Sequence, residues 1–435
     1  MKLIAINNKT KLIVFILIIL ISFYRSPYIF LNGRFIAEEA NHHYLFALNN
    51  NFISNIFYYI ELAGYYNIVP NIFTWIATIV SIENAPYVTV YSSFIIILIL
   101  PYLTLFRESI LFKTYSQKVI GSLILFLSPP LVVELWLNTL NSQIYLCLIS
   151  ILILFMVNLS NFQKKFNNFL IFVSGFSGIY TCALLPFFIH KYIKDKNNYN
   201  FTNVIILTSS NIVQVGLIIY SKINNKLHSS VLSNEYNIEI FSNFIYNIIA
   251  KPFFGRDLTH VIWNNLSFFG QNYNLYILFF LSSILILLLF NLKKILNIIK
   301  KDYVIIYLVL IFITISSIVL LGSLNNQISG RYAAISGIIV ILIVFDLSFK
   351  VENKLISKFL SILILLSLFT GIYEFRPKYR VNLKNPDHNY LKQLDCLNCP
   401  EWKSEIKLWR KNENYVIGLW PYPKKALILK IIKDE

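Results

Sequence analysis

Residues 86–106, PYVTVYSSFIIILILPYLTLF, form an uncharged apolar run of the length that crosses a bilayer as a helix, and Arg107, Lys113 and Lys118 follow it. Similar runs recur along the 435 residues, of which 57% are hydrophobic and only 14% charged. The mean hydropathy is +0.62. A soluble chain of this length cannot hide so much apolar side chain. The sequence therefore predicts an all-α polytopic membrane protein with about 11 transmembrane helices.

Basic residues orient the predicted spans. The net charge of +17 would suggest nucleic acid in a soluble protein, but here the lysines and arginines lie mostly between apolar segments, so no nucleic-acid partner is expected. The positive-inside rule places the N-terminus inside, with an uncleaved first span. The spans are predicted at about 12–31, 86–106, 118–137, 142–159, 202–221, 272–292, 303–322, 331–349 and 356–373.

The transmembrane domain, residues 1–373, is predicted to carry two large external loops. The first, residues 32–85, is expected to contain amphipathic helices lying on the membrane, and the second covers residues 222–271. The segment 168–189 is ambiguous, because a single crossing would put three lysines outside. Gly175 and Gly178 favour two short helices that return to the inside.

The tail, residues 374–435, is predicted to form a small external α+β cap, because Trp402, Ile406 and Trp409 share one helical face and a β-prone run follows. Four cysteines are present. Cys147 and Cys182 lie in apolar segments and are expected to be buried packing residues. Cys396 and Cys399 form a C-x-x-C pair, for which a local disulfide is expected, with two free thiols as the alternative.

Glu38 and Glu39 are the strongest candidates for catalysis. A carboxylate near the bilayer surface can act as a general base toward a hydroxyl; alternatively, the pair caps a helix. His42 and His43 follow each glutamate by four residues. On an α-helix that spacing predicts carboxylate–imidazole hydrogen bonds or half of a metal site, with interfacial packing as the other interpretation.

Other polar groups stand at predicted span ends. Arg331 and Tyr332 begin a late span after the loop SLNNQISG, where an arginine can bind phosphate in a bidentate manner or simply reach lipid headgroups. Asn141 belongs to an amide-rich turn between two spans and is expected either to bind sugar hydroxyls or to cap a helix. Arg256 and Asp257 in the second loop are expected to form a local salt bridge.

Several segments together resemble multi-span glycosyltransferases of the GT-C class, in a poorly characterised bacterial branch. In chain order they are NGRFIAEEANHHYLFALNN (32–50), AGYYNIVPNIFTWIA (63–77), ELWLNTLNSQIYLCL (134–148), GRYAAIS (330–336) and CPEWKSEIKLWRKNENYVIGLWPY (399–422). The branch usually has aspartate and glycine where this chain has Glu39 and Ala40, and usually a proline in the segment that begins GRY. The resemblance is discontinuous, and the order of the motifs is its main support.

The resemblance implies transfer of a sugar from a polyprenyl-phosphate donor to a glycan, lipid or protein acceptor of the cell envelope, with inversion. Glu38 or Glu39 would be the general base, and Arg331, beside Tyr332, would bind the leaving phosphate. His42 or His43 would assist either group or help to hold a divalent ion, and Asn141 would contribute to substrate binding. A divalent cation is a further expectation. The bacterial inner membrane is the expected location, with the tail outside. The rival interpretations are a transporter, flippase or polymerase of lipid-linked saccharides, and a non-catalytic assembly subunit.

Overall fold

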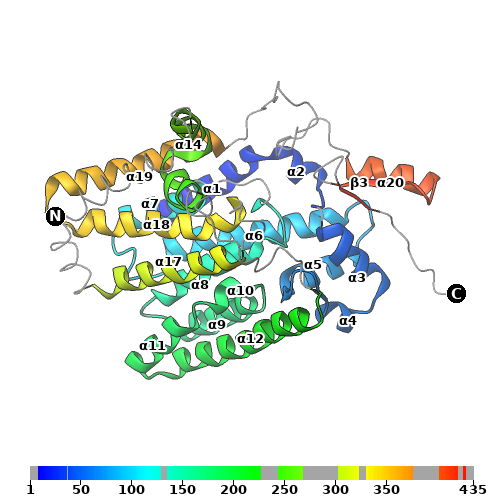
Figure 1. Ribbon diagram of the computed structural model, residues 1–435, viewed down its shortest axis with the longest axis horizontal. Coiled ribbons are helices and arrows are strands. Elements are labelled where there is room, and N and C mark those ends of the chain that lie inside the picture. The colour runs from blue at the N-terminus through cyan, green and yellow to red at the C-terminus, as the bar shows by residue number, and fades with distance from the viewer. Residues whose placement is uncertain are drawn as a thin grey trace.

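Long apolar helices build most of the protein. The computed structural model describes residues 8–36, 38–128, 135–226, 243–267, 302–322, 330–375, 401–419 and 425–427. Within these ranges, five helices are long and apolar enough to cross a membrane: α6 (Ala85–Phe106), α12 (Asn198–Ile223), α17 (Tyr303–Gly322), α18 (Gly330–Lys350) and α19 (Lys354–Phe375). The chain is therefore a mostly helical integral membrane protein (Figure 1). The predicted span at 272–292 lies outside the described residues.

The remaining elements are shorter. Three of them are apolar helices that pack among the long ones: α5 (Ile68–Ile79), α7 (Tyr115–Leu127) and α8 (Ser142–Leu154). The others are α1 (Asn8–Arg25), α2 (Pro27–Asn32), the π-helix η1 (Glu39–Tyr44), α3 (Leu45–Asn49), α4 (Phe52–Ile56), β1 (Tyr59–Ile60), β2 (Tyr65–Tyr66), α9 (Asn161–Gly175), α10 (Ile179–Cys182), α11 (Leu185–Asp195), η3 (Ile245–Ala250), α14 (Lys251–Ser267), α20 (Trp402–Lys411), β3 (Ile417–Leu419) and β4 (Lys425–Leu427).

Three predicted spans were too long. The first helix ends at Arg25, and Pro27 begins the separate α2. Helix α7 ends at Leu127, far short of the predicted 137, because Ser128 precedes a proline and adopts an extended conformation. Helix α8 ends at Leu154, after which Phe155 and Met156 pair with residues 109 and 110. Apolar composition predicted these segments, but local breakers and pairing set their ends.

The segment around Gly175 and Gly178 is broken, as the sequence favoured. Helix α9 ends at Gly175, and Gly178 has a φ of +93° that suits glycine. The tip of this hairpin joins the first loop, where Ile68 N–H donates to the Phe176 carbonyl. Asn167 of α9 and Lys191 of α11 both contact Met156, which follows the end of α8. Helix α11 therefore returns to the end of α8 at which α9 begins.

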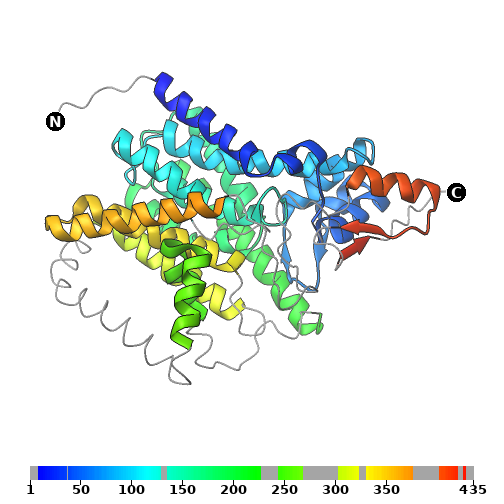
Figure 2. The same cartoon turned by 90° about the horizontal axis from the view of Figure 1, so that it is seen from above.

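The C-terminal elements form a helix followed by a two-stranded antiparallel hairpin, β3–β4. Trp402 of α20 packs edge-on against Phe35 with ring centroids 5.0 Å apart, and its indole N–H donates to the Ile82 carbonyl. Glu405 accepts hydrogen bonds from the Gly418 N–H and the Tyr415 hydroxyl. The mixed α+β character predicted for the tail is present here, and these elements lie on the first loop (Figure 2).

The cysteines divide between described and undescribed parts of the chain. Cys147 and Cys182 are free and buried in the helical core, which confirms their predicted packing role. The predicted disulfide between Cys396 and Cys399 lies outside the described residues.

Candidate functional site

A sharp turn after α2 positions the acidic pair. Gly33 has a φ of +67°, and a Cβ there would lie 3.2 Å from Pro86 Cβ, so the turn needs glycine to pack on α6. Tyr91 of α6 donates its hydroxyl hydrogen to the Phe30 carbonyl at 3.1 Å. Arg34 is buried and donates to the Trp136 carbonyl at 2.8 Å. The turn therefore ties the start of the first loop to α6 and to the segment before α8.

Glu39 is a fully buried connector. One carboxylate oxygen accepts hydrogen bonds from both the N–H, at 2.9 Å, and the hydroxyl of Thr139, and the other accepts from the Ile36 N–H at 3.4 Å. Burial raises the pKa of Glu39, while these donors and the nearby Arg34 guanidinium act to lower it. With both oxygens occupied and no exposed surface, Glu39 holds η1 against the turn at residues 138–141.

His43 does not pair with Glu39, so the structure contradicts one of the alternatives for this histidine, the i,i+4 carboxylate–imidazole hydrogen bond. The segment winds as a π-helix, in which hydrogen bonds join residues five apart and the α-helical stacking of positions four apart is lost. His43 Nδ1 instead lies 2.8 Å from Asn71 Oδ1 of α5. Burial lowers the pKa of His43 to about 4, so the imidazole is neutral at pH 7.

Asn71 fixes the tautomer of His43. The Asn71 amide nitrogen donates to the Ile56 and Tyr58 carbonyls, at 3.0 and 2.7 Å, so its oxygen faces the imidazole as an acceptor. His43 Nδ1 must therefore carry the hydrogen. The neutral ring keeps its acceptor lone pair on Nε2.

Glu38 occupies a different environment from Glu39. It is half-buried, and its charge acts on His43 and on Tyr65 of β2. The Tyr65 hydroxyl accepts a hydrogen bond at 3.2 Å from the side-chain amide of Gln143, at the start of α8. Burial raises the pKa of Tyr65, with smaller contributions from its charged neighbours.

Arg331, near the start of α18, also acts electrostatically on this tyrosine. Its guanidinium lies over the Tyr332 ring, 4.8 Å from the centroid, and donates to the Tyr332 hydroxyl at 3.0 Å. The Arg331 charge acts on Tyr65 and on Tyr180, which lies at the tip of the broken hairpin. Glu38 and Arg331 thus both act on Tyr65, and Arg331 also acts on Tyr180, although these residues come from separate parts of the chain.

The other predicted candidates have more local roles. Asn141 is half-buried at the turn into α8, where Asn138 accepts a hydrogen bond from the Leu140 N–H and closes the turn. His42 is half-buried beside His43. Arg256 and Asp257 form the expected local contact, at 3.5 Å.

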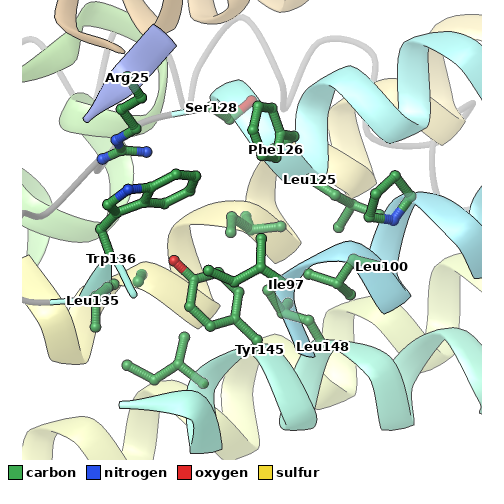
Figure 3. Close-up of a pocket in the computed structure, with 14 residues that line it drawn as sticks. Arg25, Ile97, Leu100, Leu125, Phe126, Ser128, Leu135, Trp136, Tyr145 and Leu148 are labelled. Atoms are coloured by element: carbon green, nitrogen blue, oxygen red, sulfur yellow. The ribbon is translucent and has the colours of Figure 1, made fainter. Parts of the chain in front are cut away.

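A buried cation at the end of α1 escaped the sequence analysis. Arg25 lies over the Trp136 ring, 4.2 Å from the centroid, and within 5.0 Å of the Phe375 ring centroid. Figure 3 shows Arg25 and Trp136 above Tyr145, and all three residues line a cavity of about 30 Å³. That volume holds about one water and cannot hold a sugar. An arginine inside an apolar run was the available signal, and its role here is to join α1, α19 and the segment before α8.

Sequence reasoning also missed Tyr65 and Tyr180 as site residues, although Tyr65 falls in a quoted motif and Tyr180 follows Gly178. Among the described residues, no group of three or more His, Cys, Asp or Glu side chains is placed to hold a metal ion. Comparisons with protein-family models, curated proteins and solved structures find no match to this chain.

Proposed function

We propose that this protein is an inverting glycosyltransferase that takes its sugar from a polyprenyl-phosphate carrier, with Glu38 as the general base. The observation that carries the proposal is that Glu38 of the first loop and Arg331, at the start of α18, both act electrostatically on Tyr65. A carboxylate and a guanidinium that both act on the same tyrosine suit a reaction in which one group accepts a proton and the other stabilises negative charge.

Glu38 is a better base than Glu39. The two oxygens of Glu39 are already occupied by donors from Thr139 and Ile36, and its side chain has no exposed surface. A base must reach the hydroxyl that it deprotonates, and only Glu38 is partly exposed. In this division of roles, Glu39 fixes η1 and so positions its neighbour.

The reaction proceeds in one displacement. Glu38 takes the proton of the acceptor hydroxyl as that oxygen forms a bond to the anomeric carbon of the sugar. The bond from that carbon to the carrier phosphate breaks on the opposite face, and the leaving phosphate keeps the electron pair. Arg331, held by its contact with Tyr332, binds the departing phosphate and stabilises its charge.

The test compares surface glycans and lipid-linked saccharides, by mass, in cells that carry native protein, Glu38→Gln or Glu61→Gln. Glu61 is a matched control, since it lies in the same loop and pairs at the surface with Lys226. The proposal predicts that Glu38→Gln alone loses one sugar unit and accumulates its polyprenyl-phosphate donor. Unchanged masses for Glu38→Gln, at equal membrane levels and alongside a defect in the full deletion, would instead favour transport or assembly.

A further inference from the structure

A second cavity lies away from the acidic pair, at the end of the helical bundle where α11 returns. Its volume is about 280 Å³, and its polar lining comes from α9, α11, α12, α17 and the turns just before α9 and α12. Asn200 lines this cavity, whereas Gln214 on the same helix holds Tyr66 of the first loop. Their positions on α12 place them about 20 Å apart along the helix axis. The cavity is thus distinct from the site of the proposed glycosyl transfer (Figure 1).

The lining is strongly basic. Lys164, Lys191 and Lys194 face a single carboxylate, Asp195. The Lys191 ammonium donates to the Leu154 and Met156 carbonyls, at 2.5 and 3.3 Å, which leaves one of its three hydrogens for a ligand. The Lys194 ammonium lies 4.1 Å from the centroid of the Tyr303 ring. Because three lysines line the cavity beside one carboxylate, these groups favour an anion.

Asn200 adds a hydrogen-bond acceptor to the positive charge of the lysines. Its side chain is only 2% exposed, and its amide nitrogen donates to Asp195 at 3.1 Å. That bond fixes the amide orientation, so Asn200 Oδ1 is left as an acceptor. Within the part of the chain that the structure describes, this buried oxygen has no hydrogen-bond partner. A ligand hydroxyl would satisfy it.

We propose that this cavity binds a phosphorylated polyol, with the phosphate against the lysines and a hydroxyl donating to Asn200. The volume is at the lower end of the range for small-molecule sites, about 300 Å³, and suits a phosphate carrying a short hydroxylated chain. A phosphoglycerol group has this chemistry. It can come from the headgroup of an anionic membrane lipid or from free glycerol phosphate.

The test uses the full-length protein in detergent. Native mass spectrometry measures how much of each of three lipids the protein retains: phosphatidylglycerol, phosphatidylethanol and phosphatidylcholine. Phosphatidylethanol has the negative charge of phosphatidylglycerol but no headgroup hydroxyl. Calorimetry measures free glycerol phosphate. Selective retention of phosphatidylglycerol identifies the lipid as the source, and binding of glycerol phosphate identifies the soluble source.

Variants locate the binding. Lys194→Gln, at an exposed lysine, is expected to weaken binding about tenfold. Lys165→Gln is the matched control, because Lys165 is exposed on α9 and does not line the cavity. Asn200→Leu should remove the preference for phosphatidylglycerol over phosphatidylethanol. Equal retention of all three lipids without glycerol phosphate binding would overturn the proposal, as would equal effects of Lys194→Gln and Lys165→Gln.

Discussion

Replacing Glu39 with glutamine should destabilise the protein even though the two side chains have nearly the same shape. The amide oxygen can accept the two hydrogen bonds from Thr139, but the amide nitrogen then faces the Ile36 N–H, so two donors meet in a buried site. A buried donor without an acceptor costs about 1–3 kcal/mol. The opposite amide orientation satisfies Ile36 and leaves the Thr139 N–H facing a donor instead.

The assay heats purified protein in detergent and measures the fraction that remains soluble at each temperature. It compares native protein, Glu39→Gln and Glu38→Gln. The half-buried Glu38 should tolerate the change within about 0.5 kcal/mol. Glu39→Gln should unfold at a clearly lower temperature than both. If Glu39→Gln were as stable as native protein, the connecting role assigned to that carboxylate would be wrong.

Three further predictions follow from the same contacts. Burial lowers the pKa of His43 from 6.5 to about 4, so its contribution to stability is fully present above pH 6.5. That contribution is lost as the pH falls from 6.5 through 4, and the loss amounts to about 3 kcal/mol. Unfolding measured between pH 7 and 4 should therefore show a steeper loss of stability for native protein than for His43→Gln. Gly178→Ala should lower both stability and activity, since its Cβ would lie 1.9 Å from the Gln143 oxygen. Trp402→Ala should cost about 3–5 kcal/mol and expose the first loop to limited proteolysis.

The sequence predicted those parts of the fold that depend on local composition. The bounds of α6, α17, α18 and α19 fall within two residues of the predicted spans, because uncharged apolar runs end at polar residues. Gly175 and Gly178 marked the broken hairpin, because glycine is favoured where a helix ends and where the backbone takes a positive φ. The early end of α7 could also have been foreseen, because Pro129 and Pro130 stand inside the predicted span.

The site was less predictable, since it depends on contacts between distant segments. The π-helical segment that begins at Glu39 is held by hydrogen bonds to Thr139 and Asn71, which no local pattern reveals. The electrostatic influence of Arg331 on Tyr65 likewise depends on tertiary structure. The acidic pair itself was found from the sequence, but the different environments of Glu38 and Glu39 required the structure.

The most direct measurement of the central claim uses the donor lipid that accumulates in cells lacking the protein. Membranes containing native protein, Glu38→Gln or Glu39→Gln are given this lipid, and release of polyprenyl phosphate is measured per folded protein. A general base contributes about 10²–10⁴-fold, so Glu38→Gln should be slower by that factor, while folded Glu39→Gln keeps most of its activity. Equal rates for Glu38→Gln and native protein would contradict the account.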